Sequence, residues 1–576
     1  MVFPLSPRLP VALAFGVATL ALAGCGTKQG EGQQQEAQAC AGDNGGLSLP
    51  PGFCSSVFAD GLGHVRHLVV APDGVVYANS QPGNEEGDAA ASGLIVLRDT
   101  DGDGKADEVK RPHAGEKGGT GVALRDGQVY LEDGDRIMRY PLDPASHLPT
   151  GKGEVVLTGL ATEGDHRSHS IVIAQDGALY VNSGSATNAC QKENRQAGSP
   201  GETPCEEKAL RAGIWRYEAG KLGQAFSPAG RYASGIRNAV GLALDGSGRL
   251  FATQHGRDQL HENWGALYDA DQGQNLPAEE LVEVTKGSDY GWPECYYDSN
   301  QKKLVLAPEY GGDGGRKVEQ CAQRKAPVAA FPAHWAPNAL AIYEGSQFPP
   351  AYRGGAFIAF HGSWNRAPGP QGGFNIVFQP MKEGQASGSY VIFADGFAGP
   401  GKESGDAEHR PAGLAVGPDG ALYISDDKAG RIWKVTYSGD PAAAVTGAEE
   451  VVVAKPKDVP AKPSETPGDT PSALPPGVTA AMVERGRLIY SGAQGSATCS
   501  GCHGPNGEGS EIAPKLADQQ WLWGKGELAD IRNIIVKGVP QPKRHAAPMP
   551  PYGGAEMTPE EVDAVAAYVW SLSHRR

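Results

Sequence analysis

A short phrase recurs along the first three quarters of the chain: an apolar segment, a tight turn built on Asp-Gly, and a second apolar segment. It occurs at residues 71–79, 124–131, 174–182, 244–252 and 417–425. Because Asp-Gly favours a tight turn between antiparallel strands, each copy predicts a β-hairpin. Most neighbouring copies begin about 50 to 70 residues apart, which is typical of β-propeller blades. The alternative is an all-β sandwich with coincidental turns, and the repetition favours the propeller.

Composition divides the chain into five predicted parts. They are a signal peptide (1–24), a flexible tether (25–46), a β-propeller domain (47–437), a Pro-rich linker (438–477) and a small all-α domain (478–576). The tether is rich in Gly, Gln and Glu, and the linker in Pro, so neither can bury an apolar core. The predicted fold class is therefore an all-β propeller joined to a small helical domain.

The first residues predict export. A single arginine precedes an apolar run that ends at Gly24 and is too short to span a bilayer after processing. Leu22-Ala-Gly-Cys25 resembles the bacterial lipoprotein signal, which implies a lipid on Cys25 and attachment to a membrane. An ordinary secretory signal with an incidental cysteine is the alternative. We expect the protein on the periplasmic side of a bacterial cell envelope.

Charge and cysteine content narrow the choice of partners and compartment. A net charge of −16 argues against nucleic acid, whose phosphates require a basic surface. Of nine cysteines, Cys25 is assigned to the lipid and two belong to the motif described next, which leaves six. An even remainder in an oxidising compartment suggests disulfides. Although six cysteines allow fifteen pairings, sequence neighbours propose Cys40–Cys54, Cys190–Cys205 and Cys295–Cys321.

The helical domain carries Cys499-Ser-Gly-Cys502-His503, the attachment signature of a c-type haem. Two cysteines form thioethers to the haem, and the histidine is the proximal iron ligand. Met549, in a proline-rich loop, is the predicted sixth ligand, and His545 and Met557 are its rivals. A zinc or disulfide pair is the alternative, but a zinc site would need a second ligand pair nearby. The arrangement resembles the class I cytochrome c family.

An acidic loop in the propeller domain alternates carboxylates with glycine. Asp99, Asp101, Asp103 and Asp107 occupy positions 1, 3, 5 and 9 of a loop like an EF-hand, but Lys110 stands where the bidentate glutamate belongs. We expect a shorter loop that binds a structural Ca²⁺, against a merely solvated acidic turn.

Polar motifs are spread over the whole propeller domain, and loops from every blade can meet at one end of its channel. They are Gln81, 165–169, 235–238, 254–258, 287–293, 360–366 and 409–411. Together they resemble the soluble quinoprotein sugar dehydrogenases, most closely the sorbosone or pyranose dehydrogenase branch. That family implies a six-bladed propeller, pyrroloquinoline quinone (PQQ), a calcium ion beside the quinone, and oxidation of a sugar hydroxyl or hydrated aldehyde.

The resemblance also implies roles for individual residues. A quinone with three carboxylates requires cations, and the implied cofactor-binding residues are Arg237, Asn238, Arg366 and Arg410. The backbone carbonyls of Gly256 and Arg257 are implied ligands of the catalytic calcium. His166, with Asp165 beside it, is implied as the catalytic base, and Gln81 as a residue that faces the sugar. The competing histidines are His169, His255, His334 and His361.

The sequence therefore predicts a lipid-anchored quinohaemoprotein. It would oxidise a sugar or sugar-derived aldehyde and pass electrons through its own haem c to a respiratory acceptor, which is a cytochrome, an oxidase or the quinone pool. A calcium-dependent lactonase-like propeller and a non-catalytic binding propeller are the alternatives. The fused haem and the clustered arginines argue against both.

Overall fold

The computed structural model describes most of the chain. The described residues are 40, 42–82, 92–112, 116–366, 370–402, 404–447, 474–491, 499–504, 507–509, 513–518, 520–545, 548–555 and 557–574. The predicted signal peptide, Cys25 and most of the predicted tether and linker lie outside them. Among the described residues, no helix is long and apolar enough to cross a membrane.

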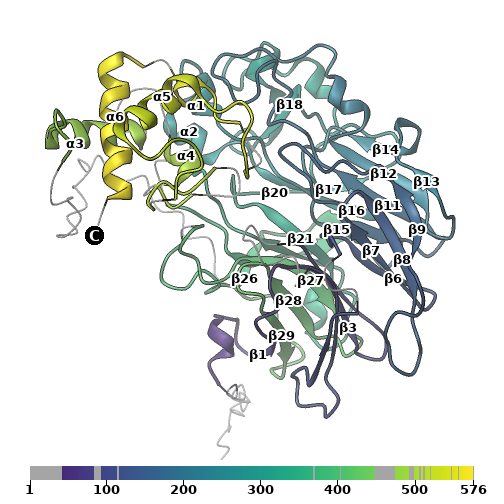
Figure 1. Ribbon diagram of the computed structural model, residues 1–576. Coiled ribbons are helices and arrows are strands. Elements are labelled where there is room, and N and C mark those ends of the chain that lie inside the picture. Colours follow the sequence, from purple (N-terminus) through teal and green to yellow (C-terminus); the bar gives the residue numbers. More distant parts are fainter. Residues whose placement is uncertain are drawn as a thin grey trace, which may run out of the picture. The chain divides into compact units, whose positions relative to one another are not determined.

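Six antiparallel sheets form the blades of a β-propeller, which confirms the predicted fold class (Figure 1). Blade 1 contains β2 (Val65–Val70), β3 (Val76–Ser80), β4 (Gly93–Arg98) and β5 (Glu108–Lys110). Blade 2 contains β6 (Val122–Arg125), β7 (Gln128–Asp133), β8 (Arg136–Pro141) and β9 (Glu154–Thr158), with β13 (Gln224–Ala225) parallel to β9. Blade 3 contains β10 (Ile171–Ile173), β11 (Ala178–Ser183), β12 (Gly213–Glu218) and β14 (Arg231–Ser234).

The second half of the ring has the same organisation. Blade 4 contains β15 (Leu242–Leu244), β16 (Leu250–Gln254), β17 (Glu279–Val284) and β20 (Ala329–Phe331). Blade 5 contains β21 (Pro337–Ile342), β22 (Ala356–Phe360), β23 (Asn375–Gln379) and β26 (Val391–Ala394). Blade 6 contains β27 (Pro411–Val416), β28 (Leu422–Asp426), β29 (Ile432–Tyr437) and β1 (Phe53–Ala59).

Short elements decorate the blades. They are the hairpins β18 (Cys295–Asp298) with β19 (Lys303–Leu306) and β24 (Met381–Lys382) with β25 (Gln385–Ala386), the helices α1 (Leu260–Trp264) and α2 (Ala270–Asn275), and the 3₁₀ turns η1 (Asn44–Gly46), η3 (Glu206–Ala209), η4 (Pro228–Gly230), η5 (Pro308–Tyr310), η6 (Glu319–Gln323) and η7 (Pro350–Tyr352). Helices α1 and α2 lie between β16 and β17 of blade 4, and the hairpin of β18 and β19 lies between β17 and β20. Blade 4 therefore carries the largest insertion.

The first strand of the fold completes the last blade. Strand β1 pairs with β29, and Phe53 lies opposite Tyr437. The ring of blades is thus closed by hydrogen bonds between the two ends of the propeller sequence. Phe53 also packs against the rings of Phe348 and Phe393, at 4.8 Å each, so the closing strand is held by apolar contacts as well.

The three expected disulfides, Cys40–Cys54, Cys190–Cys205 and Cys295–Cys321, are present and confirm the pairing by sequence neighbours. The first ties the segment before β1 to that strand. The other two close loops of 15 and 26 residues' separation, in blades 3 and 4.

Strand direction decides which loops gather at each end of the propeller. Strands β2, β6, β10, β15, β21 and β27 come first in their blades and contact one another around the centre. Each of them is followed by an antiparallel second strand. The loop before a first strand and the loop after the second strand therefore lie at the same end. The repeated Asp-Gly turns join first and second strands in five blades, so they lie at the opposite end.

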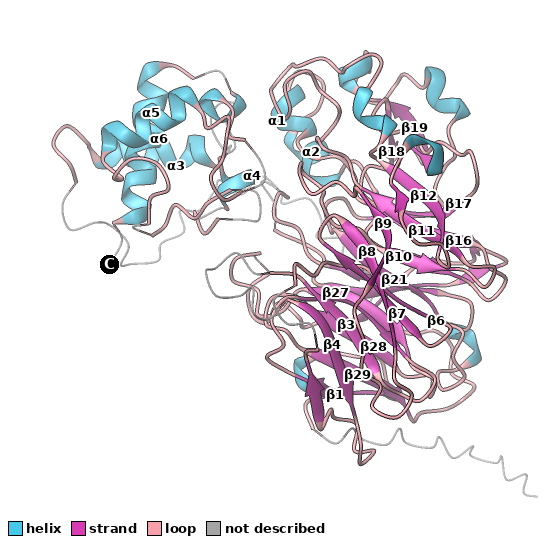
Figure 2. Ribbon diagram, turned by 45° about the vertical axis from the view of Figure 1, so that its right-hand side comes forward, coloured by secondary structure: helices cyan, strands magenta, loops and turns pink. Residues whose placement is uncertain are grey.

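The helical domain contains α3 (Ala480–Tyr490), α4 (Ser500–His503), α5 (Leu528–Lys537), η8 (Pro551–Gly554) and α6 (Pro559–Ser573) (Figure 2). A capping box opens α6, because Thr558 accepts from the Glu561 N–H and Glu561 accepts from the Thr558 N–H. Helices α3 and α6 cross closely at Gly486, where a Cβ would lie only 1.9 Å from the Ala564 carbonyl oxygen. Glycine therefore permits the packing of these two helices.

A pair of glycines in blade 3 tests the packing of the propeller. Gly213 is buried in β12, and a Cβ there would lie 2.3 Å from the Ala233 carbonyl oxygen of β14. We expect Gly213→Ala to lower the free energy of unfolding by roughly 1–3 kcal/mol, because the strands must move apart. Gly220→Ala is the matched control, since its Cβ would meet no atom within 4 Å. Denaturant midpoints of the full chain that are equal for the two variants would contradict this packing.

Candidate functional site

A cavity of about 600 Å³ opens at the end of the propeller that gathers the loops before first strands and after second strands. Its lining comes from every blade. Lining residues with chemical functions include Arg66, Gln81, Lys117, Glu132, Asp165, His166, Arg167, Arg195, Arg237, Asn238, His255, Gly256, Asp258, Glu279, His334, His361, Trp364, Asn365 and Arg410. Among them are six basic side chains and four acidic ones, so the lining is net basic in a protein of charge −16.

Asp258 is the centre of the buried charge network. One of its carboxylate oxygens accepts from Nη2 of Arg237 at 2.8 Å and from Nη2 of Arg195 at 3.1 Å. The other accepts from Nδ2 of Asn365 at 2.7 Å. Burial alone would raise the pKa of Asp258, but the charge of Arg237, a hydrogen bond to His334 and the charge of Arg195 hold it well below its ordinary value. The carboxylate therefore stays ionised between two guanidinium groups.

Asn188 fixes the geometry of the same network. Its side-chain oxygen accepts from Nη2 of Arg237 and from the Asp258 N–H, both at 2.9 Å. Its backbone carbonyl accepts from Nε of Arg237 at 3.0 Å. The Asn188 side chain is fully buried, so these bonds are protected from water. One amide thus holds both partners of the Arg237–Asp258 ion pair.

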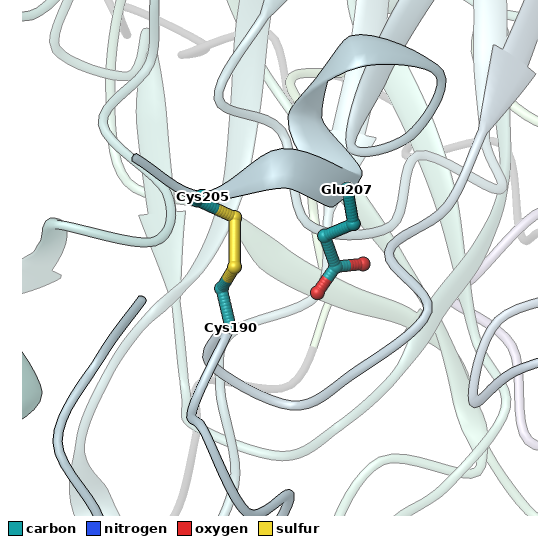
Figure 3. Close-up of side chains that lie close together, drawn as sticks. All are labelled: Cys190, Cys205 and Glu207. Carbon is teal, nitrogen blue, oxygen red and sulfur yellow. A yellow bond between two sulfur atoms is a disulfide. The ribbon is translucent and has the colours of Figure 1, made fainter. Parts of the chain in front are cut away.

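The loop that carries Asn188 is closed by a disulfide. Figure 3 shows Cys190 and Cys205 joined through their sulfur atoms, with the Glu207 carboxylate close by. Oxidised sulfurs are not thiolates, so this trio is not a metal site. Glu207 instead accepts from the Ala186 N–H and the Thr187 hydroxyl. The bridge and the carboxylate therefore stabilise the loop between β11 and β12.

The neighbours of His166 show which nitrogen of its neutral ring carries the hydrogen. Nδ1 lies 3.0 Å from the Ser185 carbonyl oxygen and 2.9 Å from the Ser185 hydroxyl. That hydroxyl donates its own hydrogen to the Thr187 carbonyl at 2.6 Å, so it can only accept from the ring. Nδ1 therefore carries the hydrogen, and Nε2 keeps its lone pair. Burial, together with the charges of Arg237 and Arg195, holds the pKa of His166 well below its ordinary value.

The other histidines of the cavity have their Nε2 atoms engaged. In His255 this atom lies 3.2 Å from the Pro337 carbonyl, and in His334 it lies 3.0 Å from the Gly273 carbonyl. In His361 it lies 2.7 Å from the Asp427 carboxylate. His169 is buried beside the cavity, and its Nδ1 binds Glu132.

The helical domain holds an apolar pocket that brings the predicted haem residues together. Its lining includes Cys499, Cys502, His503, His545 and Met549 and, from the helical core, Tyr490, Leu516, Trp521, Ile531, Ile535, Val565 and Val569. Nδ1 of His503 donates to the Pro514 carbonyl at 2.9 Å, which leaves Nε2 as the ligand atom. Met549 is held by two backbone hydrogen bonds to Val539, at 2.7 and 3.0 Å. Met557 packs against the helical core.

Comparison with known families agrees with this division. Residues 47–438, well over half of the chain, match a family described as TrAA12-like. The chain belongs to the TrAA12-like family. Residues 483–573 match the cytochrome c family, so the helical domain is a cytochrome c domain, which implies haem c.

Individual relatives match parts of this TrAA12-like chain. The PQQ-dependent pyranose dehydrogenase of Coprinopsis cinerea is 25% identical over 236 residues, which are 36% of this chain and 31% of that protein. The Cbb3-type cytochrome c oxidase subunit FixP of Sinorhizobium medicae is 40% identical over 82 residues, 13% of this chain and 26% of FixP. The chain thus spans about a third or less of these two relatives.

A solved structure supports the fold. The calcium structure of the Trichoderma reesei carbohydrate-active enzyme of family AA12 aligns with a TM-score of 0.55 and 19% identity. The alignment covers 68% of this chain and 97% of that one. At this identity the likeness concerns the fold of the TrAA12-like domain.

The structure brings most of the predicted propeller residues to one cavity. Gln81, Asp165, His166, Arg237, Asn238, Gly256 and Arg410 all line it. Arg410 donates from Nε to the His361 carbonyl at 3.1 Å and from Nη2 to the Gly362 carbonyl at 2.9 Å. Asn238 has a buried Oδ1 without a hydrogen-bond partner among the described residues.

Two predicted residues, Asp165 and Arg366, have side-chain partners that the resemblance did not imply. The Asp165 carboxylate binds Nε of Arg195 at 3.0 Å, while the His166 ring binds Ser185. Arg366 donates from Nη2 to the Asn275 side chain at 2.9 Å and does not belong to the cavity lining found in the described residues. The Arg257 side chain forms a buried ion pair with Glu309 and lines a smaller pocket, which shares Arg237, His255 and Gly256 with the main cavity.

Several residues of the site were not predicted from the sequence. Arg66 forms a buried ion pair with Asp427, and Glu279 accepts from the N–H groups of Gly256 and Ala336 at 2.8 and 3.1 Å. Burial raises the pKa of Glu279 to about 7. Asp258 is the last residue of the polar motif at 254–258, but no role was predicted for it. Arg195 lies in a loop without any recurring pattern.

The acidic loop has part of the geometry of a cation site. Oxygens of Asp99, Asp101 and Asp107 lie within 4.8 Å of one another. They also accept hydrogen bonds within the loop, such as Asp99 from the Gly102 and Gly104 N–H groups at 2.7 and 2.9 Å. Asp103 is not in the cluster and accepts from the Lys105 N–H.

Asp258 and a surface aspartate make a matched test of the charge network. We expect Asp258→Asn to lower the free energy of unfolding by about 3–5 kcal/mol, because Arg195 and Arg237 lose a buried counter-charge. Asp126→Asn removes an exposed ion pair with Arg125 and should cost under about 1 kcal/mol. Chemical denaturation of both variants checks this, and equal midpoints would show that Asp258 does not hold the network.

Proposed function

We propose that the chain oxidises a sugar or sugar-derived aldehyde with PQQ in the propeller cavity, and that electrons pass to haem c of its own cytochrome c domain. The observation that carries the proposal is the tautomer of the neutral His166 ring, which has its hydrogen on Nδ1. Its bare Nε2 belongs to a cavity-lining residue, and its lowered pKa leaves it neutral near pH 7. The name of the Coprinopsis relative, a PQQ-dependent pyranose dehydrogenase, supports the choice of cofactor and substrate.

The cavity suits a quinone that carries three carboxylates. Its volume of about 600 Å³ is within the range of small-molecule sites, and basic groups exceed acidic ones in its lining. Arg237 and Arg410 are the proposed partners of the carboxylates, with Arg66 as a further cation. The unpartnered buried oxygen of Asn238 needs a donor, which a bound ligand can supply. Arg366, which binds Asn275, would have to turn to join this set.

The residues of the chain would divide the work of the oxidation. When bound, the quinone supplies an acceptor for two electrons and a hydrogen as hydride. His166 takes the proton of the sugar hydroxyl at Nε2, and Ser185 keeps the ring in the orientation and tautomer that this requires. Asp165 acts on His166 indirectly, because it binds Arg195 and so holds that positive charge near the His166 ring. Gln81 is the proposed hydrogen-bond partner of the sugar.

Calcium remains part of the proposal at two places. The backbone carbonyls of Gly256 and Arg257 are the proposed ligands beside the quinone, and the Gly256 carbonyl also accepts from Nη1 of Arg237 at 2.8 Å. The acidic loop with Asp99, Asp101, Asp103 and Asp107 is the proposed structural site. The calcium structure of the Trichoderma protein supports a role for this ion in the family.

In the cytochrome c domain, Cys499 and Cys502 would hold the haem, and His503 and Met549 would ligate its iron. The segment between the domains keeps the two redox centres in one molecule, which raises the effective concentration of each for the other. The final acceptor would be a respiratory cytochrome, oxidase or quinone, a choice that the match to an oxidase subunit supports. The proposed location is the periplasmic side of the envelope, with a lipid on Cys25.

Reconstitution of the full chain tests the function. With PQQ and Ca²⁺ added, we expect neutral aldoses or osones to reduce the haem, measured by its absorbance. His166→Asn should slow this reduction by roughly 10²–10⁴-fold, because the base is lost. His147→Asn, at the other end of blade 2, should leave the rate unchanged. No haem reduction by any sugar, or full activity of His166→Asn, would refute the proposal.

The pH dependence of the same reaction has a defined sign. The neutral imidazole is the active form, and the pKa of His166 is lowered, so kcat/KM should fall only when the pH drops below the ordinary value of about 6.5. If kcat/KM already falls on acidification at a pH well above 6.5, His166 is not the base.

The sixth haem ligand can be identified with paired methionine variants. Met549→Ala should change the haem spectrum and lower its midpoint potential, because a thioether ligand favours the reduced iron. Met557→Ala should leave both unchanged, since Met549 lines the apolar pocket and Met557 is not among the described residues that line it. His545→Ala is the second control. A change with either control and none with Met549→Ala would exclude Met549.

A further inference from the structure

Two basic side chains of the cavity differ from the other four. Arg195 and Arg237 bind Asp258, Arg66 binds Asp427, and Arg410 binds backbone carbonyls. Lys117 and Arg167 are exposed and make no hydrogen bond or ion pair within the part of the chain that the structure describes. Their charges therefore remain available to a ligand.

Lys117 is held beside the predicted substrate residue Gln81. The loop of Lys117 packs on the end of β3, because the Gly119 N–H donates to the Ser80 carbonyl at 3.3 Å. Its aliphatic stem lies over Gly134, where a Cβ would come within 2.6 Å of the lysine Cδ. Gln81 directly follows Ser80, and Lys117 and Gln81 both line the cavity.

Arg167 has the corresponding position beside the proposed base. It directly follows His166 and lines the same cavity. The two free cations thus come from the loops before β6 and β10, in blades 2 and 3. Arg237 and Arg410, the proposed partners of the quinone, come from the loops before β15 and β27, in blades 4 and 6. The free charges accordingly lie on the loops of the proposed substrate residues. Of the proposed cofactor residues, Arg66 also reaches this side of the cavity, because its Nε donates to the Thr120 hydroxyl at 3.3 Å.

Two carboxylates near these cations are paired with other arginines, and a third accepts from a backbone N–H. Asp165 binds Arg195, and Asp135 binds Arg136 at 2.9 Å. Asp133 accepts from the Gly118 N–H at 3.2 Å. Lys117 and Arg167 themselves form no ion pair among the described residues, and the charge of Lys117 contributes to the lowered pKa of Asp135. Both cations can therefore still bind an anion.

We propose that Lys117 and Arg167 bind the carboxylate of an acidic sugar, so that the preferred substrate is a uronic acid or a related carboxylate-bearing saccharide. This inference rests on the proposed function and specifies its substrate class. The oxidation itself is unchanged: the sugar hydroxyl gives its proton to His166, and the quinone, when bound, would accept the hydride from the carbon that carries this hydroxyl. The sugar carboxylate binds and takes no part in the electron balance.

The test compares an acidic sugar with its neutral analogue. In the PQQ-loaded full chain, haem reduction gives kcat/KM for galacturonate and for galactose, at low and high salt. We expect the wild type to prefer galacturonate, and the preference to shrink with salt. Lys117→Gln with Arg167→Gln should lower kcat/KM for galacturonate roughly five- to tenfold and leave that for galactose within about twofold.

A matched double variant controls for net charge. Lys152→Gln with Lys221→Gln removes two exposed lysines from loops that follow third strands, at the end of the propeller away from the cavity. It should leave the galacturonate preference unchanged. Galacturonate added to the full chain without PQQ gives a binding readout without turnover. Its affinity for the full chain should fall only in the Lys117 and Arg167 variant.

The outcomes separate this inference from the proposed function. Haem reduction by galactose with no preference for galacturonate would overturn the substrate class alone. So would a preference that survives in the Lys117 and Arg167 variant. Weaker PQQ binding by that variant, with its preference intact, would assign the two cations to the cofactor and also overturn the inference. Haem reduction by no sugar at all would overturn both proposals.

Discussion

Each blade of the propeller begins its first strand at the end where its second strand finishes, and the functional site depends on this constraint. Gln81 follows the second strand of blade 1, His166 precedes the first strand of blade 3, and Arg237 precedes the first strand of blade 4. Because the first and second strands of each blade are antiparallel, these loops all lie at the same end of the ring. Closure by β1 then matters for the site, because an open ring would not hold blades 1 and 6 together.

A buried charge network connects the loops that the propeller brings to this end of the ring. Asp258 binds arginines from two different loops, and Arg195 in turn binds Asp165, next to the proposed base. The same guanidinium charges add to burial in lowering the pKa of His166. The buried charge network therefore also contributes to the lowered pKa of the proposed base, so the same contacts bear on stability and on the proposed chemistry.

The two domains orient their key histidines by the same device. In the propeller, the Ser185 carbonyl accepts from Nδ1 of His166, and in the cytochrome c domain the Pro514 carbonyl accepts from Nδ1 of His503. A carbonyl can only accept, so it fixes the hydrogen on Nδ1 and leaves the lone pair on Nε2. One lone pair is then suited to a proton and the other to iron.

Features that depend on neighbours along the chain were determined by the sequence itself. Asp-Gly turns set the hairpins, the Cys499–His503 motif set the haem domain, and the short separations of the cysteines set all three disulfides. These need only local turn chemistry or covalent spacing. The resemblance to a known family added the list of site residues, most of which share one cavity.

Only the tertiary structure decided which polar groups pair. Asp165 is adjacent to His166 in sequence, yet it binds Arg195, because that arginine is brought in by a loop closed by its own disulfide. Arg366 belongs to a marked motif, yet it binds Asn275 at the end of α2. Lys117 and Arg167 are ordinary basic residues in the sequence, and only the structure shows that both line the cavity and that neither forms an ion pair among the described residues. Ion pairing depends on distances between loops of different blades, and no local pattern in the chain encodes those distances.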